Sequence, residues 1–367
     1  MRGVPAPPAM AVRVLPGEER ASASALWTAL EAEIGAPALS CSWAWTGTWL
    51  EHYGDVVPHR FVVGEVGGTP RAIALVTEGP RRALRPRTLH LGTAGEPAGA
   101  GVYVERNRLL AGPADRAAFA AALIEHLLAE GGWDRLCLDG LHAEDAELLL
   151  AGRPDATVRE DDSPVADLDG GEDVLDALSS SRRQRARRTL KAFGELEGDW
   201  AATTEQAGAI LDELIELHQA RWTEAGEPGA FASERFTAFH RALVARLLPD
   251  GRAALIRVRR GEETVGCLYG HVDDGRLLFY QGGLQRYEDN KLKAGVAAHV
   301  VFMRACREHG LAEYDFLAPA TRYKEELSTR AEKLVWAELE RVSWRTRLER
   351  IARRARAVRG GAAEPTN

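Results

Sequence analysis

The sequence has few cysteines and no long apolar run, and each shortage excludes a class of protein. Its four cysteines, at positions 41, 137, 267 and 306, form no C-x-x-C pair, so we expect no zinc site and reduced thiols in the core. No run of about 18 apolar residues is present, which argues against a membrane-spanning helix. The opening MRGVPAPPAMAVRVLPG lacks the apolar segment of a secretory signal. These features favour a cytoplasmic protein.

Composition and charge are those of a soluble globular protein. The chain has 367 residues, enough for two cores, with 45% hydrophobic and 28% charged residues. A net charge of −7 gives no general attraction to nucleic acid or to anionic lipid. Basic charge is concentrated locally, in residues 182–191 and in the tail after residue 342. The usual interpretation of such a run is a solvated helix face.

The order of predicted elements repeats along the chain. After a disordered leader (1–17), the first half (18–165) is predicted to hold helices at 18–30, 42–53 and 115–130, a hairpin at 59–79, and strands at 88–92 and 133–140. The second half (166–341) is predicted to hold helices at 171–194, 210–222, 233–248, 295–309 and 323–327, and strands at 253–259, 264–272, 276–282, 313–317 and 333–341. We therefore expect an α/β fold of two similar halves, followed by a basic tail (342–367).

One loop in the second half has the pattern of an anion site. The strand LLFYQGG leads into a polar loop, and the following helix opens with the sequence NKLKAG. The amides at a helix N-terminus favour an anion, and Gly295 lets a ligand approach the backbone. Lys291 and Lys293 add positive charge beside that helix start. The alternative is an ordinary loop before a capped helix.

Four segments resemble one family of enzymes. YDFLAPATRYKEEL (314–327), LHQARWTEAG (217–226), the LLFYQGG strand and the basic segment 179–198 occur in the order found in acetyltransferases of the cellulose-biosynthesis type. The segment SWAWTGTWLEHYG (42–54) resembles the opening of the same family. These are GNAT-superfamily proteins with two tandem GNAT-like halves, related to Fem-type aminoacyltransferases. The sequence departs from the family pattern at 293–295, where Lys-Ala-Gly replaces Ser-Pro-Gly.

The resemblance implies an α/β fold of two tandem GNAT-like mixed-sheet halves and a catalytic role for the second. The donor would be acetyl-CoA or another acyl-CoA, with no metal, and its pyrophosphate would lie at Lys291, Lys293 and Gly295. The first half would be a degenerate unit. Tyr323 would protonate the leaving thiolate, and Lys324 would hold an anionic group of a substrate. The alternative for Tyr323 is that it only covers the core.

Further side chains of the second half are candidates for acid–base chemistry and for the pocket wall. Asp315 faces the cleft or pairs with an arginine, and His271 is a second candidate base. Helical spacing puts His218, Arg221 and Trp222 on one face. This face lines the acceptor pocket, or His218 is a core residue whose hydrogen bonds are satisfied. Two more candidates for the pocket wall come from the strand 276–282, namely Tyr280 and Gln281.

Three functions remain open at this stage. The first is transfer of an acyl group from acyl-CoA to an amine or hydroxyl of a small-molecule or glycan-related acceptor. The second keeps the fold with an aminoacyl-tRNA donor, which the arginines of residues 182–191 would favour. The third is a non-catalytic scaffold in a polysaccharide-assembly complex. No Ser-His-Asp order, metal cluster or P-loop motif suggests another reaction.

The basic tail has an amphipathic pattern. An apolar seam recurs at i, i+4, i+7, i+11 and i+14, formed by Trp344, Leu348, Ile351, Ala355 and Val358. One expectation is a helix docked on the body through that seam. The other is a helix that binds a membrane surface or a partner protein through it.

Overall fold

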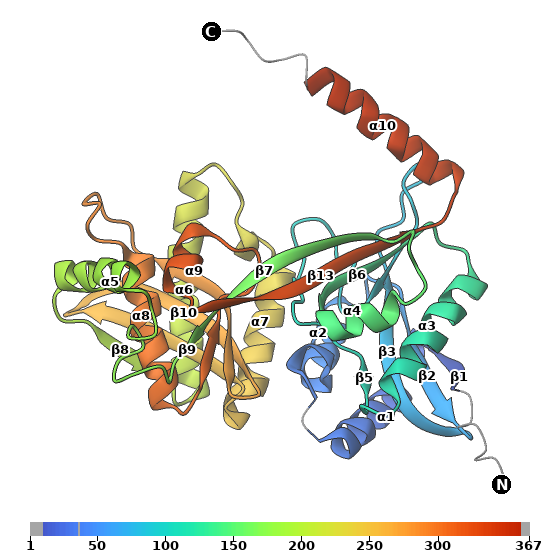
Figure 1. Ribbon diagram of the computed structural model, residues 1–367, viewed down its shortest axis with the longest axis horizontal. Coiled ribbons are helices and arrows are strands. Elements are labelled where there is room, and N and C mark those ends of the chain that lie inside the picture. The colour runs from blue at the N-terminus through green and yellow to red at the C-terminus, as the bar shows by residue number, and fades with distance from the viewer. Residues whose placement is uncertain (1–9, 36, 361–367) are drawn as a thin grey trace. The chain divides into compact units, whose positions relative to one another are not determined.

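A computed structural model describes residues 10–35 and 37–360 and divides the chain into two compact units. Unit 1 comprises Met1–Arg159 and Val335–Asn367, and unit 2 comprises Glu160–Leu334. Each unit has its own strands and its own helices (Figure 1). Within the described ranges no helix is both long and apolar enough to cross a bilayer.

Unit 1 is a mixed sheet with helices packed on it. Its elements are β1 (Ala11–Pro16), α1 (Arg20–Ile34), α2 (Trp43–Tyr53), β2 (His59–Val66), β3 (Thr69–Glu78), β4 (Thr88–Leu91), β5 (Leu110–Ala111), α3 (Arg116–Glu130), β6 (Arg135–His142), α4 (Ala143–Leu149) and the C-terminal α10 (Trp344–Gly360). Strands β1 to β4 pair antiparallel, and β4 pairs parallel with β6. The apolar face of α3, with Phe119 and Leu123, is buried against Val62 and Val76 of the sheet.

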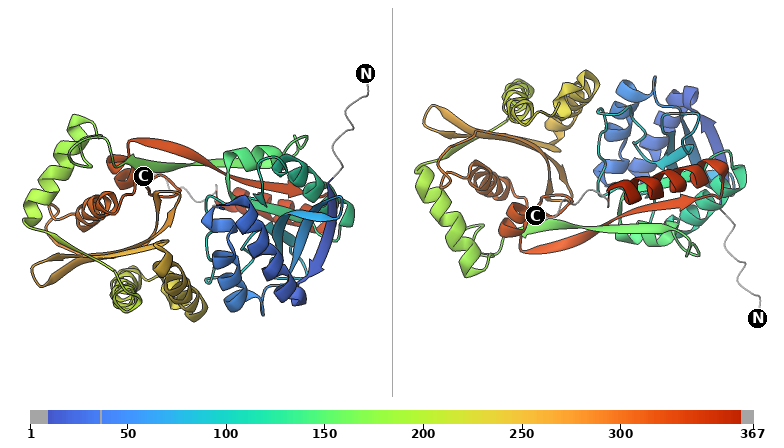
Figure 2. Two further views of the ribbon diagram at one scale, coloured as in Figure 1. Left: turned by 90° about the horizontal axis from the view of Figure 1, so that it is seen from below. Right: turned by 90° about the horizontal axis from the view of Figure 1, so that it is seen from above.

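Unit 2 repeats this plan. Its elements are β7 (Thr157–Asp167), α5 (Ser180–Phe193), β8 (Glu197–Trp200), α6 (Thr204–Glu224), α7 (Glu234–Leu247), β9 (Ala253–Arg260), β10 (Glu263–Asp273), β11 (Arg276–Leu284), α8 (Ala294–Glu308), β12 (Glu313–Asp315), α9 (Arg322–Leu327) and β13 (Arg330–Glu340). The order of strands in its sheet is β7-β12-β11-β10-β9-β8. Figure 2 shows α6 and α7 on one side of this sheet and α5 and α8 on the other. Four short 3-10 helices complete the chain, at Gly17–Glu19, Leu39–Cys41, Ala230–Ala232 and Leu248–Asp250.

The repeat extends to the pairing of strands. In each unit three antiparallel strands are followed by a helix and by a strand parallel to the third: β2-β3-β4, α3 and β6 in unit 1, and β9-β10-β11, α8 and β12 in unit 2. The strand that ends each repeat crosses the division between the units. Residues 160–167 of β7 belong to unit 2, where β7 pairs with β12, whereas Val335, Ala337 and Leu339 of β13 join the core of unit 1. The units thus divide after residues 159 and 334, whereas the predicted halves ended at 165 and 341.

The prediction of a disordered leader through residue 17 is wrong for its described part. Ala11–Pro16 form β1, which pairs with β2 from Ala11 opposite Glu65 to Pro16 opposite Arg60. Leu15 is buried in the core, and the open edge of β2 supplies partners for the backbone of β1. The Pro/Ala composition concealed this short alternating strand. Residues 1–9 lie outside the described part of the chain.

The four cysteines are free and buried, which confirms the expectation of reduced core thiols. Burial raises the pKa of the Cys267 thiol to about 12 and also raises that of Cys306, so both stay protonated at neutral pH. They therefore pack as small apolar side chains rather than acting as nucleophiles.

In unit 2 the strands β11 and β12 separate before β11 ends, which leaves an opening in the sheet beside β11. The parallel pairing of β11 with β12 ends at Leu278 opposite Asp315, whereas β11 continues to Leu284. Beyond this point the chain on the β12 side leaves the ladder and enters α9. A register shift between Tyr269 and Gly270 leaves Tyr280 as the extra residue of a β-bulge in β11. The predicted candidates of the second half lie around this opening and in the elements that border it.

Candidate active site

Helix α6 is placed against β11 by local sequence features. A capping box of Thr203 and Gln206 starts the helix. At its middle, α6 lies so close to β11 that a Cβ at Gly283 would overlap the carbonyl oxygen of Leu214. Position 283, the second glycine of LLFYQGG, therefore requires a glycine, because any side chain would push α6 away from β11. This close approach brings Leu217 and Arg221 to the end of β11.

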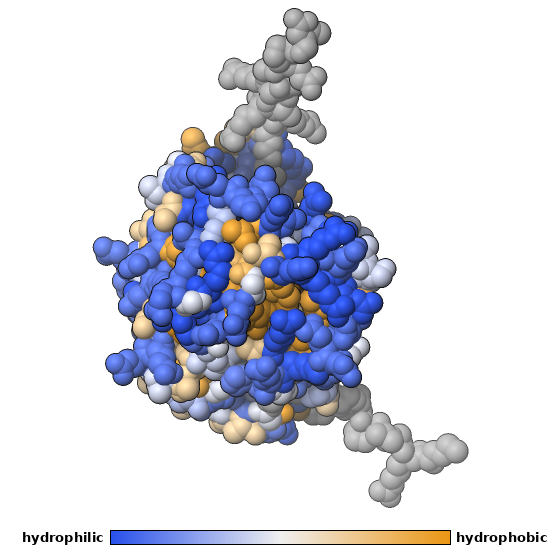
Figure 3. All heavy atoms as spheres, turned by 90° about the vertical axis from the view of Figure 1, so that its left-hand side faces the viewer, coloured by the Kyte–Doolittle hydropathy of each residue, from blue (hydrophilic) through white to orange (hydrophobic). Residues whose placement is uncertain are grey.

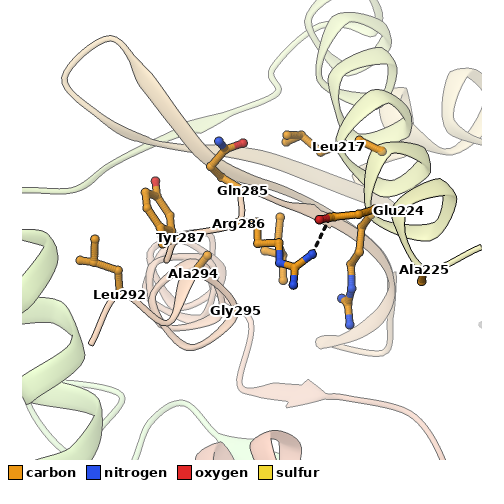
Figure 4. Close-up of a pocket in the computed structure, with 12 residues that line it drawn as sticks. Leu217, Glu224, Ala225, Gln285, Arg286, Tyr287, Leu292, Ala294 and Gly295 are labelled. Atoms are coloured by element: carbon orange, nitrogen blue, oxygen red, sulfur yellow. Dashed lines mark ion pairs between the residues drawn. The ribbon is translucent and has the colours of Figure 1, made fainter. Parts of the chain in front are cut away.

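A cavity of about 830 Å³ lies where α6, β11 and α8 meet. Its lining comes from the last turns of α6, the end of β11, the following loop and the first turn of α8, and consists of Leu217, Ala220, Arg221, Glu224, Ala225, Leu284, Gln285, Arg286, Tyr287, Leu292, Ala294 and Gly295. Two predicted residues, Arg221 and Gly295, are among them. Figure 4 shows an ion pair across the lining, in which Arg286 Nη1 lies 2.5 Å from a carboxylate oxygen of Glu224. Figure 3 shows a hollowed hydrophobic patch ringed by hydrophilic atoms on the face of unit 2 turned to the viewer.

The start of α8 has the features of an anion site. Its N-cap residue, Lys293, makes no side-chain capping hydrogen bond, and the first amides of an α-helix have no intrahelical acceptor. Asp289 shapes the preceding loop, because its Oδ1 accepts from the amide of Lys291 at 2.9 Å. Lys291 and Lys293 are exposed beside the cavity lined by Gly295. A Cβ at Gly295 would meet only Leu284 within 4 Å, so the backbone there is open to a ligand.

Tyr323 lies on α9 and its ring is held by aromatic neighbours. It stacks on His299 with centroids 5.5 Å apart and an interplanar angle of 25°, and it meets Phe316 edge-on at 6.4 Å. Burial raises the pKa of the Tyr323 phenol, and the charge of Arg221 opposes that shift. The phenol is thus protonated at neutral pH, close enough to Arg221 to feel its charge. The charge of Arg221 thus acts on a residue about a hundred positions away in the sequence.

His299 is a residue of this region that the sequence analysis missed. It is fully buried on α8, where its Nδ1 lies 2.8 Å from the hydroxyl of Tyr314. Burial, followed by the charge of Lys324, lowers its pKa to about 3, so the imidazole is neutral. A lone histidine inside the apolar run AAHVVFM gave no signal other than a polar residue at a core position.

Asp315 and Lys324 hold the turn between β12 and α9. Asp315 is fully buried, and its Oδ1 accepts from Ser163 Oγ at 2.5 Å and from the amide of Leu317 at 2.8 Å. Its other oxygen lies 3.4 Å from Arg276 Nη1, so the interpretation that pairs Asp315 with an arginine has the geometry in its favour. Lys324 is buried and donates to the carbonyl of Leu317 at 2.8 Å. Both charged groups thus fasten the backbone that leads to Tyr323.

His271 and Tyr280 belong to a buried aromatic cluster on the α7 side of the sheet. The hydroxyl of Tyr269 lies 2.7 Å from His271 Nε2, and the Tyr280 ring lies 5.3 Å from His271 and 4.6 Å from His240. Burial, with a smaller effect of Arg252, lowers the pKa of His271 to about 3, which makes it a weak base. Gln281 is half-buried on β11 opposite Tyr269.

His218, Arg221 and Trp222 share one helical face but have different environments. His218 Nε2 accepts from the indole N–H of Trp222 at 3.0 Å, so its proton is on Nδ1, which faces Gln219 at 3.2 Å. Burial, helped by Arg221, lowers the pKa of His218. The imidazole is therefore neutral and satisfied, while Arg221 lines the cavity.

We expect unit 2 to lose stability in mild acid because three of its histidines are buried in the neutral form. Burial lowers the pKa of His240 well below its usual value, and lowers those of His271 and His299 to about 3. The unfolded chain binds these protons near pH 6.5, so stability is complete above that pH and falls as the pH drops toward 3. Each histidine contributes up to about 1.4 kcal/mol per pH unit within this window.

Urea unfolding at pH 7.5 and 5.5 measures this dependence, since most carboxylates do not titrate in that interval. His271→Gln should reduce the difference in unfolding free energy between the two pH values. An unfolding free energy that stays constant between them would contradict the neutral assignment.

Known families and solved structures resemble parts of this chain. The strands and helices of unit 2 form a mixed-sheet α/β fold. Residues 180–325 match the family described as acetyltransferase (GNAT) domain. Among proteins of curated function, none matches the sequence.

Solved structures resemble the chain over most of its length. The crystal structure of FemX aligns with a TM-score of 0.58 at 12% identity and covers 89% of this chain and 97% of that one. The C-terminal domain of a protein from Agrobacterium fabrum, described as a lysylphosphatidylglycerol synthetase, aligns with a TM-score of 0.54 at 12% identity and covers 87% and 91%. At such identities the likeness shows the fold alone. The predicted fold, two tandem GNAT-like mixed-sheet halves, is confirmed.

Proposed function

We propose that unit 2 transfers an acyl group from acyl-CoA to an amine or hydroxyl acceptor. One observation carries this proposal: within the region that matches the GNAT domain, the cavity of about 830 Å³ joins the N-terminus of α8 to the open end of β11. A helix start with free amides beside the end of a strand suits a donor with a pyrophosphate at one end and a thioester at the other. The segments 217–226 and 314–327 support the finer assignment to the cellulose-biosynthesis type.

The residues have distinct roles in this proposal. Lys291, Lys293 and the amides around Gly295 would bind the pyrophosphate. Arg221 would meet the part of the donor that lies in the cavity. Tyr280, the extra residue of the β-bulge in β11, and its neighbour Gln281 would border the thioester.

The proposed reaction needs one general acid, Tyr323. The acceptor attacks the thioester carbonyl, the carbon–sulfur bond breaks, and Tyr323 donates its proton to the leaving thiolate. The proton released by the acceptor passes to water, and the phenolate then regains a proton from solvent. Because His271 is a weak buried base, we assign it a positioning role beside Tyr280 rather than proton abstraction. Asp315 and Lys324 would position Tyr323 by holding the turn that leads to it. His218 would position Arg221, which lies on the same face of α6.

Binding of the donor should stabilise the chain by mass action. At a hundredfold excess over its dissociation constant, acetyl-CoA or a longer acyl-CoA should add about 2.7 kcal/mol. Lys293→Glu should remove most of this gain, because it places a carboxylate beside the pyrophosphate. Lys191→Glu, an exposed lysine on α5, is the matched control and should keep the full shift. Thermal unfolding with and without each thioester measures the effect, and a wild-type chain that gains nothing from any acyl-CoA would contradict the proposal.

The basic surface of α5 favours a second candidate donor, an aminoacyl-tRNA. The side chains of Arg185, Arg187, Arg188 and Lys191 are exposed on α5, as an aminoacyl-tRNA donor would require. Two of them face acids, since Arg187 lies 3.2 Å from Asp176 and Arg185 3.8 Å from Glu326, which weakens this case. Stabilisation by charged tRNA but by no thioester, lost in Lys191→Glu and kept in Lys293→Glu, would favour this second function.

A further inference from the structure

The C-terminal helix α10 contacts the rest of unit 1 through its polar side. Thr346 is buried, and its hydroxyl donates to the carbonyl of Arg341 at 3.1 Å. Glu349 accepts from Arg135 at 2.7 Å and lies 3.6 Å from Arg85. Two arginines of the helix also reach acids of the unit, Arg345 near Asp134 at 3.6 Å and Arg350 near Glu340 at 3.3 Å. The side of α10 turned to the protein is therefore held by charge and hydrogen bonds.

The apolar seam of the same helix is exposed. Trp344 is 51% exposed, Leu348 44% and Ile351 63%, and their spacing puts them on one face. Among the described residues, four of the ten large apolar side chains that are exposed lie between Val342 and Ile351. A helix that packs on a core buries its apolar stripe, so α10 has the opposite orientation. The expectation that the seam docks α10 on the body is wrong for its described part, and Ala355 and Val358 lie beyond the described side chains.

Positive charge accompanies this seam. The sequence of α10, WRTRLERIARRARAVRG, contains seven arginines and one acid, in a chain whose net charge is −7. Arg347 is exposed on the flank of the seam, next to Leu348. Guanidinium groups bind phosphate in bidentate geometry, and tryptophan favours the boundary between water and hydrocarbon.

We propose that α10 binds the surface of an anionic membrane, with the seam at the level of the lipid headgroups and the arginines on lipid phosphates. A seam of three described side chains is too small for a stable protein interface, which usually buries about 1,200–2,000 Å². An interfacial helix needs only an apolar stripe flanked by cations. Because the polar side of α10 is already bound to unit 1, the seam can face a membrane while the chain stays folded. This inference does not depend on acyl transfer.

Vesicle flotation of the full chain tests the proposal. With phosphatidylcholine vesicles containing 30% phosphatidylglycerol, roughly the charge of an anionic bilayer, wild-type protein should float, and with pure phosphatidylcholine it should stay in the dense fraction. Replacing Trp344, Leu348 and Ile351 by Ser should lower the partition coefficient at least about tenfold. Arg347→Gln should lower it about fivefold. The seam variant should keep its thermal midpoint, because the three side chains are exposed.

The control replaces three exposed apolar residues of unit 1 outside the tail, Val56, Tyr103 and Val158, by Ser. It should float like wild type. Flotation of the seam variant equal to wild type, or equal binding of wild type to neutral vesicles, would overturn the proposal. A wild-type dimer in light scattering that the seam variant loses, without flotation, would assign the seam to a second copy of the chain and would also overturn it.

Discussion

Tyr323→Phe should lower kcat by about 10²–10⁴ while leaving the binding of acyl-CoA nearly unchanged. Burial raises the pKa of the Tyr323 phenol, so it keeps its proton at neutral pH, and the leaving thiolate needs a proton donor. Phenylalanine keeps the ring, so stacking on His299 and contact with Phe316 remain. Release of free thiol from an acyl-CoA in the presence of a competent amine measures turnover, and calorimetry with the unreactive CoA thioether measures binding.

Tyr103→Phe is the matched control, because Tyr103 is a strongly exposed tyrosine of unit 1. Its turnover should equal that of wild type. If Tyr323→Phe also turned over at the wild-type rate in an unchanged fold, Tyr323 would not be the acid, and its ring would only cover the core.

Arg276→Ala should destabilise unit 2 by about 3–5 kcal/mol, because it leaves the buried carboxylate of Asp315 without its cation. Arg276 contacts Glu332 at 2.8 Å and Asp315 at 3.4 Å, and it also pairs with Glu313. Asp315 is fully buried, so water cannot replace the guanidinium. The midpoint and slope of urea unfolding give the change in free energy.

Arg286→Ala gives the comparison for an exposed pair. Arg286 and Glu224 face each other across the cavity lining, but their side chains are 76% and 60% exposed. Such a pair contributes about 0–1 kcal/mol, so the variant should unfold almost like wild type. Equal small losses in Arg276→Ala and Arg286→Ala would show that the buried network at Asp315 does not stabilise the turn.

The repeated element order could be predicted because it rests on local patterns. The hairpin around Gly67-Gly68 and the strands of 253–284 alternate strongly, and their helices show clear apolar periods. The sequence could not predict that β7 and β13 cross the division between the units. Each segment has the pattern of a strand, and that pattern does not say which unit the strand joins. Strand β1 was missed because a short edge strand depends on the open edge of β2 rather than on its own composition.

Part of the candidate site could be inferred from the sequence because it, too, depends on local patterns. Lys291, Lys293 and Gly295 follow from the chemistry of a helix start, which is local in sequence. Arg221 and Tyr323 were proposed separately, and only the fold shows that the charge of Arg221 acts on the Tyr323 phenol. The burial of Asp315 and Lys324 could not be inferred, because their partners, Ser163, Arg276 and the carbonyl of Leu317, come from distant elements or from the turn itself.

The central claim, that unit 2 binds the acyl donor at the junction of α6, β11 and α8, is tested most directly by a crystal structure with acetyl-CoA bound. The account predicts the pyrophosphate at the amides around Gly295, between Lys291 and Lys293, and the thioester at the open edge of β11 within reach of Tyr323. Acetyl-CoA bound in unit 1, or bound in unit 2 away from the start of α8, would contradict it.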